Sequence, residues 1–275
     1  MIMKHLLSAV LLANGALAVA ATPTTPISSS TNQSGFFIGI GGGYNSVKTT
    51  SQSSMTLNSL SGIPTNQLLL DTATTFHATQ QNFSPEGQLG YFSNFNGTNW
   101  LWGAKLSYTY VHSKTMQRGS NRYLQGQNDA SINIVAVGPV ETNSTHGLSL
   151  LAFTGRSIAN SFVYLGVGPA LFDVSNNISG MSDIDSGYYI GTIGGFSRAH
   201  WLWGAAIQAG MTYYLNSTWF LDFNYNYATT TRRTFENTVP FSEQYNGGLN
   251  TGIVTYTINQ RITPQQIAVS INKKF

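Results

Sequence analysis

The final ten residues of the chain alternate between apolar and polar side chains, and this repeat of two limits the fold more than any other feature. Ile267, Val269, Ile271 and Phe275 share one face of the pattern, and the side chains between the first three are small or polar. Because successive side chains of a β-strand point to opposite faces of a sheet, the pattern predicts a strand with one apolar face. Such a strand needs neighbours that alternate in the same way.

Seven further segments carry the same alternation. It is clearest where Trp219, Phe223 and Tyr227 share one face and Asp222 lies on the other. We predict strands over residues 36–47, 77–95, 100–112, 146–155, 162–174, 201–215, 219–227 and 265–275.

The connections between these segments alternate in length. Residues 96–99, 156–161 and 216–218 are short connections, and the first and last are rich in the Asn, Gly, Ser and Thr of tight turns. Long connections cover residues 48–76, 113–145, 175–200 and 228–264. Outer-membrane barrels place short turns at one end and long loops at the other. The sequence therefore predicts an all-β fold over residues 35–275, an eight-stranded antiparallel up-and-down transmembrane β-barrel with long extracellular loops.

A ten-stranded barrel is the alternative, because residues 131–140 and 252–259 also alternate. Counting both as membrane strands would place the long connection 175–200 among the periplasmic turns and the tight turn 216–218 outside. We therefore interpret the two segments as strand extensions or loop hairpins.

The first 21 residues have the pattern of a secretory signal peptide. Lys4 and His5 precede an apolar run over residues 6–12, and small residues suited to cleavage follow, ending at Ala20 and Ala21. Residues 22–34 are rich in Thr, Ser and Pro without periodicity, which predicts a flexible periplasmic tail.

Composition excludes several classes of protein. The chain has no cysteine, so it has neither disulfides nor a thiol nucleophile, and no metal-ligand spacing or cofactor motif is present. Charged residues make up 8% of the chain, and its formal net charge of +3 falls to about +2 when Lys4 is removed with the signal peptide. So small a net charge does not indicate nucleic-acid binding. No apolar run after the signal peptide is long enough for a membrane helix.

The Gly-rich aromatic segment 35–44, the segment 164–170 and the terminal Phe275 resemble the small outer-membrane β-barrels of the OmpA-transmembrane-domain and opacity-protein type, which are porin-like surface proteins. The resemblance implies an integral protein of a Gram-negative outer membrane. It also implies that Ile267, Val269, Ile271 and Phe275 form a sorting signal read by the barrel assembly machinery. Lys273 departs from the family pattern, which prefers an aromatic residue there.

Three charged residues, Glu86, Lys105 and Asp222, fall on faces that the alternation assigns to the barrel lumen. Buried charges need partners, so we expect an ion-pair network that fills the interior. A narrow porin-like channel for ions or small solutes, gated by this network, is the alternative.

Five tryptophans lie near the predicted strand ends, and the five-residue sequence 100–104 recurs at 201–205. Tryptophan is favoured where lipid meets water, so we interpret the five as interfacial aromatics. They are Trp100, Trp102, Trp201, Trp203 and Trp219.

The predicted loops carry two pairs of basic residues, Arg118 with Arg122 and Arg232 with Arg233. Such cations bind the phosphates of lipopolysaccharide. They also suit recognition of a host receptor or matrix, since binding residues on rigid scaffolds concentrate in loops.

No catalytic constellation is indicated. His112 and Ser113 are adjacent in a predicted strand and so point to opposite faces. No Asp or Glu lies at a spacing that would predict a catalytic pair with His77, His146 or His200. We expect a non-enzymatic protein with a structural or host-interaction role, and a lipid A-modifying or protease barrel is a distant alternative.

Overall fold

The computed structural model describes residues 34–61, 68–71, 74–126, 132–185, 192–245 and 248–275. The predicted signal peptide (1–21) and residues 22–33 of the predicted tail lie outside the described residues. The described residues belong to one compact unit, Gln33–Phe275. No helix in this part of the chain is long and apolar enough to span a membrane.

The described residues form antiparallel strands throughout. Their bounds are β1 (Gly35–Ser61), β2 (Leu68–Asp71), β3 (Thr74–Asn94), β4 (Trp100–Gln117), β5 (Ser120–Gly126), β6 (Ile132–Val137), β7 (Val140–Ile158), β8 (Ser161–Asp185), β9 (Thr192–Tyr214), β10 (Trp219–Thr230), β11 (Arg233–Tyr245) and β12 (Gly248–Lys274).

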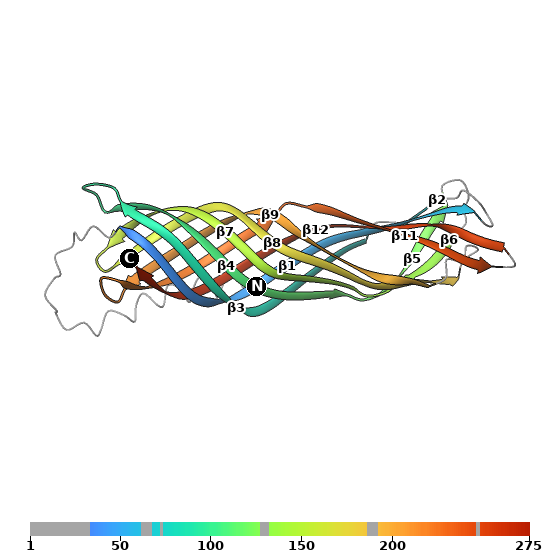
Figure 1. The fold of residues 1–275 in the computed structure, drawn as a ribbon, viewed down its shortest axis with the longest axis horizontal. Helices are drawn as coiled ribbons and strands as arrows, with labels where there is room; N and C mark the ends of the chain where they lie inside the picture. The colour runs from blue at the N-terminus through green and yellow to red at the C-terminus, as the bar shows by residue number, and fades with distance from the viewer. Residues whose placement is uncertain (1–33, 62–67, 72–73, 127–131, 186–191, 246–247) are drawn as a thin grey trace. The chain divides into compact units, whose positions relative to one another are not determined.

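Eight of these strands close into a ring, in the order β1-β3-β4-β7-β8-β9-β10-β12 and back to β1 (Figure 1). The last strand closes the ring against the first, with Phe37 opposite Lys274 and Tyr44 opposite Ile267. Glycine permits β1 to approach β12 closely at this seam, because a Cβ on Gly41 would lie 2.6 Å from the Cα of Ser270. The predicted eight-stranded barrel is therefore confirmed.

The prediction that the long connections are loops is wrong for most of their length. β1 continues to Ser61 and pairs with β12 over residues 49–61 and 251–262. Four inward side chains of this extension are at most 1% exposed: Met55, Leu57, Val254 and Tyr256. Buried and outward side chains therefore still alternate along these strands, but many of the outward ones are Ser or Thr. Of the segment 131–140, residues 132–137 form β6 and Val140 begins β7, whereas residue 131 lies outside the described residues. Residues 252–259 belong to β12, so the two segments lie in this extension and add no membrane strand to the ring.

We call this extension the stalk. It consists of residues 49–61, 140–144, 171–185, 192–203 and 248–262 of β1, β7, β8, β9 and β12, together with β2, β5, β6 and β11. In Figure 1 these four shorter strands gather at the end of the barrel away from the short turns. The end with the short turns is called the turn end below.

Outside the stalk, the barrel has an apolar outer face and a partly polar interior. Large apolar side chains on eight strands point outward, among them Ile38, Leu89, Leu106, Leu150, Leu165, Ile207, Phe223 and Val269, which are 37–63% exposed. Buried polar side chains such as Gln88, Gln208 and Asn224 point inward. This inverted arrangement is typical of a barrel whose outer face contacts lipid.

Apolar layers fill the interior on both sides of the polar side chains. The aromatic plug lies at the turn end and comprises Phe37, Phe92, Leu101, Phe153, Phe162, Tyr164, Tyr214 and Phe220. The middle layer lies where the barrel meets the stalk and comprises Val47, Val111, Leu151, Ala170, Phe172, Val174, Leu202, Ala206, Ala228, Phe235 and Ile262.

Candidate functional site

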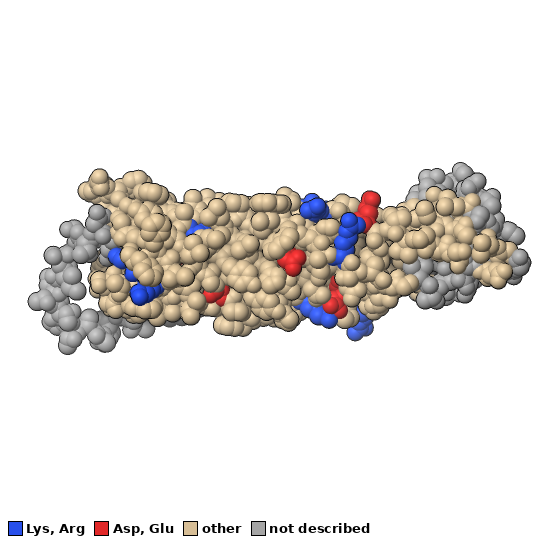
Figure 2. Space-filling view, viewed as in Figure 1, with Lys and Arg blue, Asp and Glu red and all other residues tan. Residues whose placement is uncertain are grey.

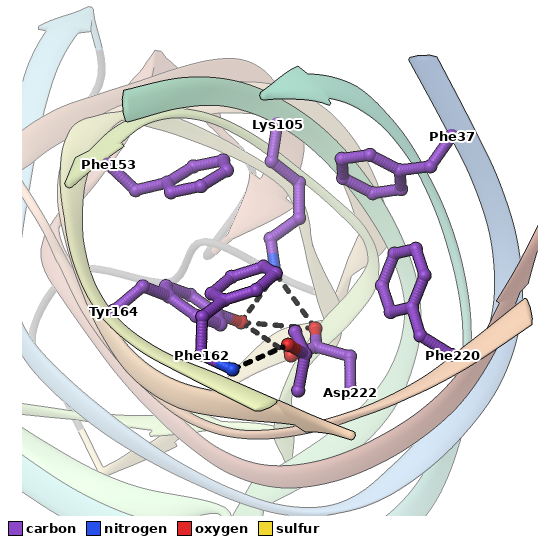
Figure 3. A pocket seen from close by; sticks show the side chains of 8 residues that line it. Phe37, Lys105, Phe153, Phe162, Tyr164, Phe220 and Asp222 are labelled. Carbon is purple, nitrogen blue, oxygen red and sulfur yellow. Dashed lines mark hydrogen bonds and ion pairs between the residues drawn. The ribbon is translucent and has the colours of Figure 1, made fainter. Parts of the chain in front are cut away.

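The lumen holds a buried ion pair between β4 and β10. Lys105 Nζ lies 3.2 Å from Asp222 Oδ2, and both side chains are 3% exposed (Figure 3). The Tyr164 hydroxyl joins them, since it accepts a hydrogen bond from Lys105 at 3.0 Å and donates one to Asp222 Oδ1 at 2.8 Å. The side-chain amides of Gln88 and Asn224 also donate to Asp222, at 3.4 and 3.2 Å. Asp222 is therefore fully hydrogen-bonded as a carboxylate.

The aromatic plug leaves little space beside this pair. Figure 3 shows the rings of Phe37, Phe153, Phe162 and Phe220 around Lys105 and Asp222. The cavity that they line has a volume of about 10 Å³, which is about the smallest space that holds one water molecule.

Glu86, the third predicted lumen charge, is buried and points inward but does not join the pair. Its carboxylate lies beside the side-chain amide of Gln266 on β12, and it forms no ion pair with Lys105. The expected three-member network is therefore a two-member ion pair with a separate carboxylate. Sequence reasoning missed Tyr164 and Gln88 as members, although their inward position follows from the same alternation.

A second concentration of charge lies where the barrel meets the stalk, and we call it the outer rim. Figure 2 shows one band in which Lys, Arg, Asp and Glu side chains gather. Lys114 Nζ lies 2.7 Å from Glu141 Oε2, and its hydrogen bond holds the pKa of Glu141 below its usual value. The Arg198 side chain donates to the carbonyl of Glu236 at 2.8 Å, and that of Arg233 donates to the carbonyl of Trp201 at 3.2 Å. These two bonds join β9 to β11, which are not paired with each other in the described part of the sheet.

Two cations of the outer rim come together through strand register. Arg261 of β12 lies opposite Thr50 of β1, and Lys48 is two residues further along β1 on the same outward face. Such diagonal neighbours are about 7–8 Å apart. Neither forms an ion pair with another described residue. No sequence pattern indicates this pairing, because each residue is a single cation in a predicted loop.

The four predicted basic residues lie in the stalk or at its base. Arg118 and Arg232 are exposed in the connections that follow β4 and β10. Arg122 belongs to β5, and Arg233 begins β11. Register therefore does not bring them into one cluster.

The histidines of the outer rim are held by aromatic neighbours. His146 Nδ1 is 2.8 Å from the Tyr108 hydroxyl, and His112 Nδ1 is 3.3 Å from that of Tyr110. His112 is exposed, whereas Ser113 is 4% exposed and points inward, so the two cannot act together.

The other two histidines have different surroundings. His77 lies 3.3 Å from the Thr50 hydroxyl through Nδ1. The His200 ring stacks on Phe235 at 4.6 Å. Burial lowers the pKa of His200, and the charges of Arg198 and Arg233 lower it further. No three His, Cys, Asp or Glu residues of the described chain are grouped as a metal would require.

The tryptophans border the outward apolar band. Trp100 and Trp219 begin β4 and β10 at the turn end, with Trp102 one repeat further in. Trp201 and Trp203 lie at the opposite side of the band, next to the outer rim.

The terminal strand presents its predicted residues outward. Ile267, Val269 and Ile271 are 41–46% exposed, and Phe275 is 71% exposed. Lys273 Nζ lies over the rings of Trp219 and Phe275, at 5.9 and 5.2 Å from their centroids. Lys273 thus belongs to an aromatic cluster at the turn end.

A closed ring satisfies every backbone group within the sheet, and only closed barrels and helices can cross a lipid bilayer. With its apolar band facing outward and aromatic residues at both borders, the chain is an integral β-barrel protein of the bacterial outer membrane. Short turns face the periplasm in this class, so the stalk lies outside the cell.

Comparison with solved structures returns outer-membrane proteins of this kind. OprG from Pseudomonas aeruginosa is 15% identical over 89% of this chain and 99% of its own, with a TM-score of 0.38. Ail, the attachment invasion locus protein of Yersinia pestis, is 11% identical over 79% of this chain and 97% of its own, with a TM-score of 0.27. The protease OmpT from Escherichia coli is 11% identical over 93% and 99%, with a TM-score of 0.34. No protein-family model and no curated protein matches the sequence.

Proposed function

We propose that the protein is a non-enzymatic surface barrel that presents contact sites to a host or to another surface above the outer membrane. The observation that carries this proposal is the stalk, because it has its own packed core. That core comprises Met55, Leu57, Val137, Val140, Ile178, Met181, Phe241, Val254, Tyr256 and Ile258. A packed interior holds the strands in fixed positions, as a scaffold for recognition requires.

The stalk is long enough to carry its tip away from the membrane. β12 runs from Gly248 to the outer rim at Arg261, which is roughly 40 Å along an extended strand. Near the tip, Leu60, Tyr123 and Leu249 are 50%, 61% and 57% exposed. Exposed aromatic and large apolar side chains are suited to anchor a protein contact.

The packing of the lumen favours this role over a channel. The aromatic plug lies on one side of the Lys105–Asp222 pair and the middle layer lies on the other. An eight-stranded barrel is only wide enough for its own inward side chains. Ion flow would require both layers to open.

Removing the tip anchors tests the proposed surface role. Replacing Leu60, Tyr123 and Leu249 together by serine is expected to lower adhesion of cells that display the protein by about tenfold or more, since contact anchors each contribute at least about 1 kcal/mol. The measurement is the number of cells retained on immobilised matrix proteins and glycans.

Met116→Ser is the matched control, because Met116 is 53% exposed but lies at the base of the stalk. It should adhere like the wild type, and all variants should keep the mobility difference between boiled and unboiled samples. Equal adhesion by the wild type, the triple variant and cells without the protein would contradict a role in adhesion.

The outer rim suits lipopolysaccharide as the lipid partner, because Lys48 and Arg261 are exposed cations that lie close together and form no ion pair with a described residue, and such cations bind phosphates. Replacing both by glutamine is expected to weaken lipopolysaccharide binding by about tenfold or more, since each cation near an anionic lipid surface contributes about 1 kcal/mol. The binding should also lose much of its salt dependence. Titration of fluorescent lipopolysaccharide into refolded protein measures both effects.

Arg156→Gln is the control for charge alone, because Arg156 is exposed at the turn end, where lipopolysaccharide phosphates are absent. It should bind like the wild type. A similar loss in this variant would mean that net charge, and not the outer rim, determines the binding.

A further inference from the structure

The turn end of the barrel carries cations without matching acidic side chains. Among the described residues of the turns and strand ends there, the charged side chains are Arg156, Lys273 and Lys274, and none is Asp or Glu. Neither lysine lies within ion-pair distance of an acidic group of the described chain, the carboxylate of Phe275 included. This end of the protein therefore favours a negatively charged partner.

Lys273 is held among aromatic rings on the lipid-facing side of the barrel. Its Nζ lies 5.9 Å from the centroid of the Trp219 ring and 5.2 Å from that of the Phe275 ring. Strand register produces the first contact, because Lys273 lies directly opposite Trp219. Both rings attract the ammonium through their faces and leave N–H donors that can reach an anion.

Further aromatic residues continue along the same border of the apolar band. The backbone N–H of Phe275 donates to the carbonyl of Phe36 at 2.8 Å. The Phe36 ring lies 4.9 Å from that of Tyr91, which lies 6.0 Å from that of Trp102. Such a girdle of aromatic residues lies at the interface between lipid and water. Lys273 is therefore at the depth of the lipid headgroups in the periplasmic leaflet.

The other two cations of the turn end have different surroundings. Lys274 Nζ lies 5.8 Å from the centroid of the Tyr214 ring, which belongs to the aromatic plug and is 8% exposed, so Lys274 is on the lumen side. Arg156 is on β7, which lies four strands from β12 in either direction around the ring. Lys273 is thus the cation that this face of the barrel offers to lipid.

We infer that Lys273, Trp219 and Phe275 form a binding site for an anionic phospholipid of the periplasmic leaflet. The ammonium donates to the lipid phosphate, and the two rings contact the glycerol backbone and the upper acyl chains. A zwitterionic headgroup carries its own cation beside the phosphate, so it gains less from Lys273. The site is independent of the proposed surface role, which concerns the opposite end of the barrel.

Local quenching by labelled lipids tests the site, and the absence of cysteine from the chain makes it feasible. Ser217, in the turn before Trp219, is replaced by cysteine and labelled with an uncharged fluorophore. The full chain is refolded into phosphatidylcholine vesicles that contain a small, equal fraction of nitroxide-labelled phosphatidylglycerol or phosphatidylcholine. Phosphatidylglycerol should associate about fivefold more strongly at this position, since one cation near an anionic lipid contributes about 1 kcal/mol.

Lys273→Gln should remove most of this preference, and Lys273→Arg should keep it. Lys274→Gln is the matched control, because it removes the same charge from the neighbouring residue on the lumen side, and it should behave like the wild type. Equal quenching of the wild type by the two lipids would overturn the inference. So would an equal loss of preference in Lys273→Gln and Lys274→Gln, because the effect would then come from net charge and not from a site.

Discussion

Replacing Asp222 with alanine is expected to destabilise the folded barrel by about 3–5 kcal/mol, because the Lys105 ammonium would remain buried without its partner. The variant also removes the acceptor for Tyr164, Gln88 and Asn224. Urea unfolding of protein refolded into lipid vesicles measures the change, which should appear as a lower midpoint with an unchanged slope.

The double variant Lys105→Met with Asp222→Leu is the control for this experiment. It removes both charges together, and replacing a buried ion pair with apolar side chains of similar size is often close to neutral. The double variant should therefore be more stable than Asp222→Ala alone. If both variants were equally unstable, the loss would come from packing and not from the unpaired lysine.

A second large effect is expected at the aromatic plug. Phe92 is fully buried, and its ring lies 5.4 Å from that of Phe162 and 6.2 Å from that of Phe220. Phe92→Ala should destabilise the barrel by about 3–5 kcal/mol, since the rigid wall cannot collapse into the space left behind. Tyr123→Ala in the stalk is the comparison, because Tyr123 is 61% exposed outside the lipid-facing band, and it should change stability by about 0.5 kcal/mol or less. Similar losses in both variants would contradict a packed plug.

The ring of strands could be predicted from the sequence because a lipid-facing barrel repeats one simple pattern. Apolar side chains such as Leu221 and Phe223 must alternate with inward polar ones such as Asp222, and the turn lengths then give the order. The stalk could not be predicted in the same way. Its outer face is covered by Ser and Thr, so Met55 and Leu57 stand in a segment with the composition of a loop.

The candidate sites were predictable only in part, for a related reason. Alternation places Glu86, Lys105 and Asp222 inside the barrel but does not say which carboxylate Lys105 reaches. That choice depends on the relative stagger of β3, β4 and β10, which places Gly90, and not Glu86, opposite Lys105. Lys48 and Arg261 likewise become neighbours only through the register of β1 with β12.

The pairing of β1 with β12 has a consequence for how the chain is made. The strand that closes the ring is the last to be synthesised, and its partner is the first strand of the barrel. Contacts so distant in sequence form slowly. Until β12 arrives, the long edge of β1 is open to pairing with any other extended chain. The open edge of β1 is therefore the place where wrong pairing can begin before the ring closes.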